Sequence, residues 1–312
     1  MKRIFFLSVA MLLCAAGMSI AATRLWPIET PKGDAETVFT VLADGEIQDT
    51  TMADYLIGVV AAEMPASFEP EALKAQAVAA RTYILDRAAH PVPAHPDAVV
   101  CDDPGCCCAY ASADKLRENW GGDYRKNLRR IRGAVRQTDG QTLTWEGEPI
   151  RAVFHSSSGG QTEASAALWG AVPYLVSVSS PETAADVPGF ETTVTVSAAD
   201  AEQALGVTLP EAPAQWIGET VRDGASRVET ITIGGKTLTG AEARGLFHLR
   251  STNFNAEVLD GNLVFHVTGS GHGVGMSQYG ANVMAQEGSI YSEILAHYYP
   301  GTVLESESSN LP

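Results

Sequence analysis

The sequence predicts an α+β protein: an exported domain of two lobes with a groove between them, preceded by one N-terminal helix. Amphipathic helical patterns share the chain with strand patterns that end in hairpin turns, which is typical of an α+β fold. An acidic, alanine-rich tract over residues 181–260 then changes the composition. A length of 312 residues gives each lobe enough chain for its own core.

The N-terminal helix is predicted within residues 1–26. Lys2 and Arg3 precede an uncharged stretch over residues 4–22, which at about 1.5 Å per residue just crosses a hydrocarbon core of about 30 Å. We expect a single-pass membrane anchor; the alternative is a cleaved signal peptide, for which Ala21 and Ala22 supply small residues. Because the two cations stay cytoplasmic, residues 27–312 lie on the extracytoplasmic side in either case, and are secreted if the signal is cleaved.

The elements of the first lobe follow in order. Residues 27–50 alternate as a strand does, with Val38, Thr40 and Leu42 on one face and a turn at Asp44-Gly45. Three helices are predicted, over residues 52–63, 70–87 and 123–136. Pro65 ends the first helix and Pro70 begins the second, because proline is tolerated only in the first turn.

Strands and loops dominate the rest of the chain. Hairpin strands are predicted over 138–180 around the Glu146-Gly147 turn. The tract 181–260 is expected to form an inserted second lobe of short strands. A strand at Leu263–Val267 then leads into a glycine-rich loop and a closing helix from about Gln278.

Glu63 is the first candidate for chemistry. It lies on the apolar stripe of the helix 52–63 and in its last turn. Loss of hydration and the negative end of the helix dipole both raise the pKa of such a carboxyl. A carboxylic acid that stays protonated near neutrality suits general-acid attack on a glycosidic oxygen, whereas the alternative is a side chain that bends to solvent.

Lys74 and Arg81 are the candidate substrate cations. They lie seven residues apart in the helix 70–87, and therefore project from one face. Together they suit an anionic or polar substrate, and the alternative is a solvated cationic edge of the helix.

A cysteine-rich loop is the candidate metal site. His95, Cys101, Cys106, Cys107 and Cys108 fall within fourteen residues, and thiolates with an imidazole in a tetrahedral set suit zinc. Disulfides are the alternative in an exported protein, although vicinal cysteines rarely pair and no second CxxC is present. Both interpretations stay open at this point.

Two loops offer further contacts to a ligand. The segment 155–160 presents hydroxyl groups, Ser157 among them, but lacks the G-x-S-x-G pattern of a serine nucleophile. Glycines over 269–275 let backbone approach a ligand beside His272, Gln278 and Tyr279, while the spacing is wrong for a nucleotide phosphate. These four side chains are the remaining substrate-binding candidates.

The net charge excludes one class of partner. The chain has 21 Lys and Arg against 37 Asp and Glu, a net charge of −16, which disfavours binding to nucleic acid. Eight of the 21 cations fall over residues 115–136. A solvated helix face is the default interpretation of that run, and contact with an anionic wall polymer or partner is the other.

Five segments in order resemble the stage II sporulation protein D family. They run from about residue 50 to 302, so the resemblance covers most of the exported chain. The segments are Ala62-Glu-Met-Pro65, Glu71-Ala-Leu-Lys-Ala-Gln-Ala-Val-Ala-Ala-Arg-Thr-Tyr83, His155-Ser-Ser-Ser-Gly-Gly-Gln-Thr-Glu163, Gly271-His-Gly-Val-Gly-Met-Ser-Gln-Tyr-Gly-Ala281 and Ile294-Leu-Ala-His-Tyr-Tyr-Pro-Gly301.

The resemblance implies a membrane-anchored lytic transglycosylase that cuts the MurNAc–GlcNAc bond of peptidoglycan glycan strands, stripped of stem peptides, during spore engulfment. It implies that Glu63 is catalytic and that Lys74 and Arg81 line the substrate groove. It also implies three partners: the glycan strands, a sporulation amidase and a membrane protein.

The resemblance implies zinc as well. Some members bind zinc with two histidines and two cysteines, and His95, Cys101 and Cys107 fall on three of those positions. Cys106 stands where the fourth ligand is a histidine, and this exchange keeps a soft donor. The resulting ligand set is His95, Cys101, Cys106 and Cys107.

A single acid is sufficient for the implied reaction. Hydrolysis uses a second carboxylate, whereas a lytic transglycosylase uses the C6 hydroxyl of its own substrate as the attacking group. The alternatives are a non-catalytic wall-binding enhancer of an N-acetylmuramoyl-L-alanine amidase and a zinc hydrolase. The Glu-Met-Pro setting of Glu63 favours the enzyme over the enhancer, and four protein ligands would leave a catalytic zinc no open position.

Overall fold

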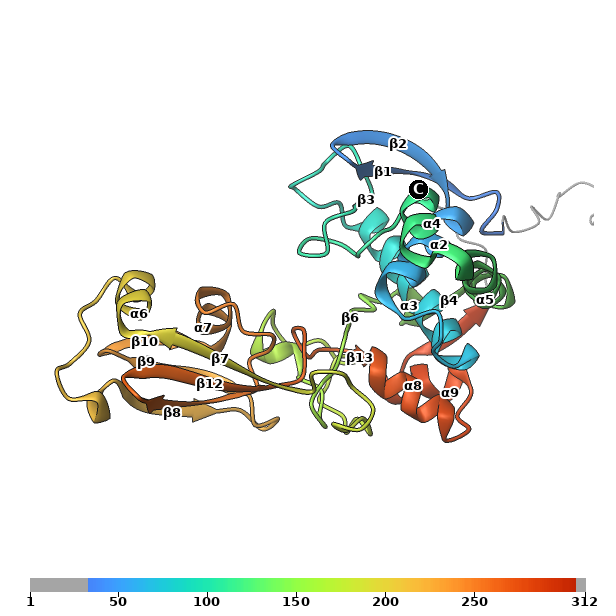
Figure 1. Cartoon of the computed structure of the whole chain (residues 1–312). Coiled ribbons are helices and arrows are strands. Elements are labelled where there is room, and N and C mark those ends of the chain that lie inside the picture. Colours follow the sequence, from blue (N-terminus) through green and yellow to red (C-terminus); the bar gives the residue numbers. More distant parts are fainter. Residues whose placement is uncertain (1–32, 307–312) are drawn as a thin grey trace, which may run out of the picture.

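The computed structural model describes residues 33–306 and confirms a mixed α+β fold with several small sheets. Figure 1 shows two lobes, a largely helical one that holds both ends of the described chain and an elongated one built on strands. The predicted helix within residues 1–26 lies outside the described residues. No helix within residues 33–306 is long and apolar enough to cross a membrane.

The helical lobe is organised around α3 (Pro70–Ala89), which begins with proline in its first turn as predicted. Alanines recur along α3, so its short side chains let other elements pack closely around it. Most of the residues between Ala72 and Asp86 are buried. The elements packed on α3 are α2 (Met52–Glu63), α5 (Tyr124–Gln137), α8 (Gln278–Gln286), α9 (Tyr291–Tyr298) and β4 (Gln141–Trp145).

Small sheets cover this helical core. The predicted hairpin is β1 (Val38–Ala43) and β2 (Glu46–Thr51), which pair antiparallel around Asp44-Gly45. One face of β1 packs on the helical core, and its side chains Phe39, Val41 and Ala43 are buried. β3 (Val100–Cys101) pairs parallel to β1, while β14 (Val303–Ser306) and β5 (Glu148–Pro149) flank β4.

A short helix that was not predicted lies between α3 and α5. α4 (Ala113–Trp120) begins at Ser112, whose hydroxyl accepts a hydrogen bond from the Lys115 backbone N–H, and it ends at Gly121. Its only buried residue is Leu116, so the sequence has no apolar stripe there to announce a helix.

The second lobe has its own hydrophobic core, which includes Leu205, Ile231, Phe254 and Phe265. Two three-stranded sheets and two helices, α6 (Ala198–Leu205) and α7 (Gly240–Leu246), enclose it. One sheet contains β8 (Ile217–Arg222), β9 (Val228–Ile233) and β10 (Lys236–Thr239). The other contains β7 (Glu191–Ser197), β11 (Phe254–Leu259) and β12 (Asn262–Thr268).

The boundaries of this lobe differ from the tract 181–260. The predicted strand at Leu263–Val267 belongs to β12, which pairs with both β7 and β11 and is therefore the central strand of one sheet of the second lobe. An apolar strand pattern does not say which sheet the strand joins, and this is why the sequence placed the boundary too early.

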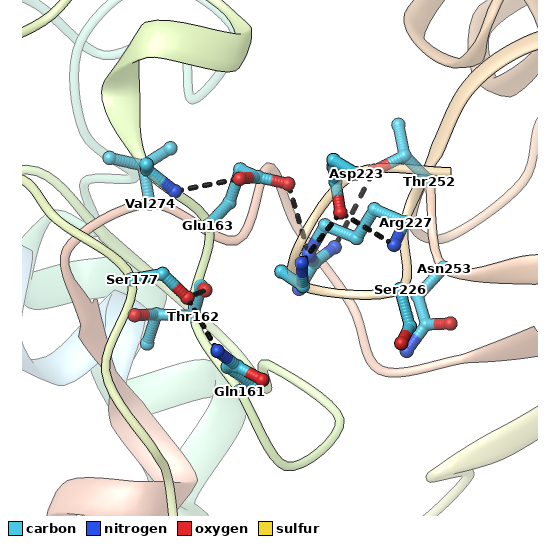
Figure 2. A network of polar contacts seen from close by, with 12 residues as sticks. Gln161, Thr162, Glu163, Ser177, Asp223, Ser226, Arg227, Thr252, Asn253 and Val274 are labelled. Carbon is cyan, nitrogen blue, oxygen red and sulfur yellow. Dashed lines mark hydrogen bonds and ion pairs between the residues drawn. The ribbon is translucent and has the colours of Figure 1, made fainter. Parts of the chain in front are cut away.

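A short parallel pair and a polar network join the two lobes. β6 (Phe154–His155) pairs with β13 (Met276–Ser277) where the chain leaves and re-enters the helical lobe. Figure 2 shows Glu163 facing Arg227 and Asp223 of the second lobe. The buried Arg227 guanidinium donates from Nη2 to the Ser158 carbonyl at 2.7 Å, and its Nε lies 3.8 Å from Glu163 Oε2.

Candidate functional site

Glu63 is the last residue of α2, and its side chain lines a cleft of about 520 Å³. The preceding turn buries Val59 and Val60 in the core, which fixes the end of the helix. Each carboxyl oxygen accepts one hydrogen bond: Oε1 from the Ala109 backbone N–H at 2.8 Å and Oε2 from Gln278 Nε2 at 2.9 Å. The carboxyl group is therefore held in one orientation at the cleft wall.

Burial raises the pKa of Glu63 above its ordinary value. The hydrogen bonds from Gln278 and from the Ala109 backbone act in the opposite direction, because both stabilise the ionised form. The side chain can therefore hold a proton and, after giving it away, remains stabilised as a carboxylate. These are the two states that a general acid/base must occupy in turn.

Gln278 is held in place by its neighbours. It is the first residue of α8, whose N-terminus is capped by the Ser277 hydroxyl. Its amide nitrogen lies 3.5 Å from the Oε1 atom of Gln76, a buried residue of α3. Gln76 was not predicted as a site residue. A polar side chain within the alanine-rich run of α3 is the sequence feature that could have indicated it.

The cleft is lined by both lobes. Three arginines contribute to it: Arg87 at the end of α3, Arg151 before β6 and Arg244 from α7. None of the three was predicted. The other lining residues are Tyr83, Pro104, Gly105, Cys106, Cys107, Cys108, Ala109, Val153, Phe154, His155, Trp169, Gly271 and His272.

Two histidines lie together in the cleft and are uncharged near neutrality. Burial, followed by the nearby Arg244 charge, lowers the pKa of His272 to about 4. Burial also lowers the pKa of His155 well below its ordinary value, and the two ring centroids are 5.7 Å apart. His272 Nδ1 accepts a hydrogen bond from the Val274 backbone N–H at 3.1 Å, so the neutral ring carries its proton on Nε2.

The structure places Lys74 and Arg81 away from this cleft, which corrects their expected role. Arg81 is fully buried, and its guanidinium donates to both carboxyl oxygens of Asp34 and, at 2.9 Å, to the Gln141 carbonyl. Lys74 pairs with Glu71 and lines a separate hollow between α3 and α5. The two cations do share one helix face, but Tyr83 and Arg87 are the α3 residues that line the Glu63 cleft.

Of the four loop residues predicted to bind substrate, two lie at the cleft and two lie outside it. Gln278 contacts Glu63, and His272 lines the cleft. Ser157 is instead buried outside it, with its hydroxyl 3.4 Å from Glu182 Oε1. The Tyr279 ring packs edge to face on Phe68, with centroids 5.0 Å apart.

The predicted metal ligands form one cluster. A single donor atom from each of His95, Cys101, Cys106 and Cys107 lies within 4.8 Å of all the others, so the cluster could hold a metal ion. Nε2 of His95 is 3.5 Å from Cys106 Sγ and 3.4 Å from Cys107 Sγ. Its Nδ1 lies 2.9 Å from the Ala98 carbonyl, which leaves Nε2 as the nitrogen free to coordinate.

These distances fit zinc better than a disulfide. Tetrahedral bonds of about 2.3 Å to sulfur and about 2.0–2.1 Å to nitrogen place a sulfur and a nitrogen ligand about 3.5 Å apart. The 4.0 Å between Cys106 Sγ and Cys107 Sγ is near the tetrahedral spacing for two sulfurs and far from a disulfide bond. All four cysteines of the described chain are free thiols.

The comparisons with known proteins agree with the sequence motifs. A family model described as stage II sporulation protein matches residues 44–145. The chain is 41% identical over 268 residues to the stage II sporulation protein D of Bacillus amyloliquefaciens, an alignment that covers 85% of this chain and 77% of that protein. It is 40% identical over 273 residues to the protein of the same name in Bacillus subtilis, covering 86% and 78%. It is also 30% identical to an amidase enhancer of Bacillus subtilis, covering 80% of this chain and 40% of that protein.

Proposed function

The chain belongs to the stage II sporulation protein D family, and from this premise we propose that it is a lytic transglycosylase. Its substrate would be the peptide-free glycan strand of peptidoglycan, cut between N-acetylmuramic acid and N-acetylglucosamine. One observation carries the proposal: Glu63, with its raised pKa, lies in a cleft beside two fixed hydrogen-bond donors. A binding module would have no use for a buried acid of this kind.

The proposed reaction needs one acid and no water. Protonated Glu63 gives its proton to the glycosidic oxygen as that bond breaks. The resulting carboxylate then accepts the proton of the C6 hydroxyl, whose oxygen closes the 1,6-anhydro ring. Glu63 is the only carboxylic acid among the described residues that line the cleft, so the pair required for hydrolysis is missing there.

Gln278 and Ala109 have a defined part in this cycle. Both donate to the Glu63 carboxyl group, and both bonds strengthen when the carboxyl ionises. They therefore hold the side chain in position during the first step and stabilise the carboxylate between the two steps. His155 and His272 are neutral, so they add no positive charge that would lower the pKa of Glu63.

We propose zinc as the metal of the cysteine loop, bound by His95, Cys101, Cys106 and Cys107. Four protein donors close the coordination shell, so the ion would have a structural role. The loop that it fixes runs directly into Ala109, which donates to Glu63. Metal binding would thus keep one of the two donors of Glu63 in place.

Metal analysis of the full chain, purified without chelators, tests this assignment. We expect about one zinc per chain, lost in Cys106→Ala and kept in Cys108→Ala, because Cys108 is outside the donor cluster. A chain that has no metal and no free thiols would instead contain disulfides.

The location and partners of the protein are part of the proposal. We place the described lobes on the extracytoplasmic side of the cell membrane, held by the N-terminal segment, where peptidoglycan is present. A sporulation amidase would release the stem peptides from the strands, and a membrane partner would hold both enzymes together.

Product analysis tests the activity. Purified peptide-free strands should yield ends of 1,6-anhydromuramic acid, and digestion in ¹⁸O water should leave those ends unlabelled. Reducing ends that carry ¹⁸O would mean hydrolysis. Intact strands, with faster release of stem peptides by an added amidase, would favour the enhancer function of the similar Bacillus subtilis protein instead.

A further inference from the structure

The three arginines of the cleft point to the group that is recognised beside the scissile bond. We propose that Arg87 and Arg151 form a carboxylate subsite, which binds the lactyl carboxylate of a muramic acid residue in a peptide-free strand. This inference rests on the proposed function and assigns it a specific contact.

The charge of the cleft is opposite to that of the chain. The whole protein has a net charge of −16, yet the described cleft residues include three arginines and one carboxyl group whose pKa is raised. The two histidines of the cleft are neutral near neutrality, since burial lowers the pKa of both. The cleft is therefore a local cationic site in an acidic protein, which attracts an anionic ligand.

Arg87 is held ready for such a ligand. Its guanidinium carbon lies over the Tyr83 ring, 4.8 Å from the centroid, and this cation–π contact restrains the side chain. Its Nε is buried and has no hydrogen-bond partner among residues 33–306. A buried donor without an acceptor costs free energy, so a carboxylate oxygen that reaches Nε after a small side-chain movement would be bound favourably.

Arg151 is the exposed member of the pair. Its side chain is 40% exposed, and its Nε lies 3.5 Å from Oδ2 of Asp86, the residue next to Arg87. Asp86 thus orients Arg151 without occupying its other nitrogens. Arg244 reaches the cleft from the second lobe, where its Nε donates to the Leu249 carbonyl at 3.4 Å.

A carboxylate is the anion that this arrangement suits on a glycan. Guanidinium groups bind carboxylates through two parallel hydrogen bonds, which a neutral hydroxyl or amide cannot match. In a strand that still has its stem peptides, the lactyl carboxyl is tied up in an amide and has no charge. Removal of the peptide restores the charge, so the subsite would select stripped strands.

The cations of α5 form a different kind of surface and supply the control. Arg125, Arg129 and Arg132 are exposed, and none of them lines the Glu63 cleft. Arg132 is therefore a matched arginine outside the proposed subsite.

Binding to two glycans tests the subsite. The Glu63→Gln full chain, which cannot turn over, is titrated with peptide-free strands and with N-acetylglucosamine oligomers of equal length, which have no lactyl group. We expect the peptide-free strands to bind at least about tenfold more tightly, as is typical of hydrogen bonds between charged groups. Arg87→Gln or Arg151→Gln, added to this background, should remove most of that preference and leave the affinity for the oligomers unchanged.

Three outcomes separate the possibilities. Arg132→Gln should retain the full preference, and a loss there equal to that of Arg87→Gln would reduce the effect to net charge and overturn the subsite. A preference that survives in both Arg87→Gln and Arg151→Gln would also overturn it, while the proposed function stands. No binding of either glycan by the folded parent would instead contradict the proposed function. Because Arg151 is partly exposed, its variant tests the subsite even where Arg87→Gln disturbs folding.

Discussion

Glu63 and Glu182 receive hydrogen bonds from adjacent residues of one segment, yet they occupy very different surroundings. Gln278 donates to Glu63, and Ser277 donates to Glu182 at 2.7 Å. Glu182 also accepts bonds from the Ser158 backbone and hydroxyl, both at 2.7 Å, and from the Ser180 hydroxyl. Glu63 has one donor on each oxygen and lines a cleft, whereas Glu182 is enclosed by its donors.

Under the proposed function, this difference separates a carboxyl group that can react from one that is structural. A carboxylate enclosed by several donors has no open side that a ligand can approach. A carboxyl group with two donors and an open side can exchange a proton with a bound molecule. Burial alone does not distinguish Glu63 from Glu182. The number of hydrogen-bond donors and the access to the cleft distinguish them.

The largest expected effect is the loss of activity in Glu63→Gln. The amide keeps the shape of the side chain but cannot give and retrieve the proton, so cleavage of peptide-free strands should fall by about 10²–10⁴-fold. The amide oxygen can still accept one of the two hydrogen bonds that Glu63 accepts, while an NH₂ group replaces the second acceptor, so stability should fall by no more than about 1–3 kcal/mol. Turnover rates and a urea unfolding curve measure the two properties.

Full activity of the folded Glu63→Gln variant would contradict a catalytic role for Glu63. A Glu63→Asp variant serves as a second control: it keeps the acid, moves it by one methylene group, and should retain part of the activity.

Glu182→Ala should lose stability rather than chemistry. The change leaves several buried donors without their acceptor, among them the Ser158 backbone N–H, and each such group costs about 1–3 kcal/mol. We expect the free energy of unfolding to fall by about 3 kcal/mol or more. Activity per folded molecule should remain measurable at low temperature, and a variant as stable as the parent would contradict a structural role for Glu182.

The sequence was sufficient to single out Glu63, whose carboxyl group lies in the cleft, but not the cations around it. Glu63 stands out because it is a charged residue on an apolar helix stripe. A spacing of seven places Lys74 and Arg81 on one face, but α3 is buried almost all round, so no polar face shows which side meets a ligand. Arg87 lies in the last turn, where a cation is ordinarily explained by the helix dipole.

Residues that are close in sequence were predicted best. The four candidate metal donors lie within thirteen residues, so local spacing already indicated their cluster. Gln278 and His272 follow glycines whose positive φ angles shape the loop, as at Gly271 with φ 107° and Gly273 with φ 87°. Ser157 belonged to a similar loop, but only the fold shows that its hydroxyl faces Glu182 rather than the cleft.

The Gln278→Leu variant tests the effect of hydrogen bonding on the pKa of Glu63, because it removes one of the two donors to that carboxyl group. The bond from Gln278 lowers the pKa of Glu63, so its loss should raise that pKa. The first step needs protonated Glu63, and the rate therefore falls as pH rises through this pKa. The alkaline limb of the pH–rate profile should therefore move to higher pH.

Gln76→Leu is the matched control for that shift. It removes only the 3.5 Å contact that orients the Gln278 amide, so the limb should move less than in Gln278→Leu. A limb that stays in place in Gln278→Leu, or moves to lower pH, would show that this amide does not control the proton on Glu63.

Glu163 is another buried glutamate, and its expected effect is a gradual change of stability with pH. Burial, followed by the hydrogen bond and charge of Asp223, raises the pKa of Glu163 to about 7, while Arg227 opposes this. Between the ordinary value of 4.5 and about 7, the folded chain keeps a proton that the unfolded chain releases, so this group makes stability fall as pH rises. The slope should be on the order of 1 kcal/mol per pH unit in this window. Glu163→Gln, which cannot ionise, should lose that slope and gain stability relative to the parent at pH 8, as measured by urea unfolding at several pH values. Parallel curves for the two chains would mean that Glu163 ionises normally in the folded state and that Arg227, rather than a shared proton with Asp223, sets its charge.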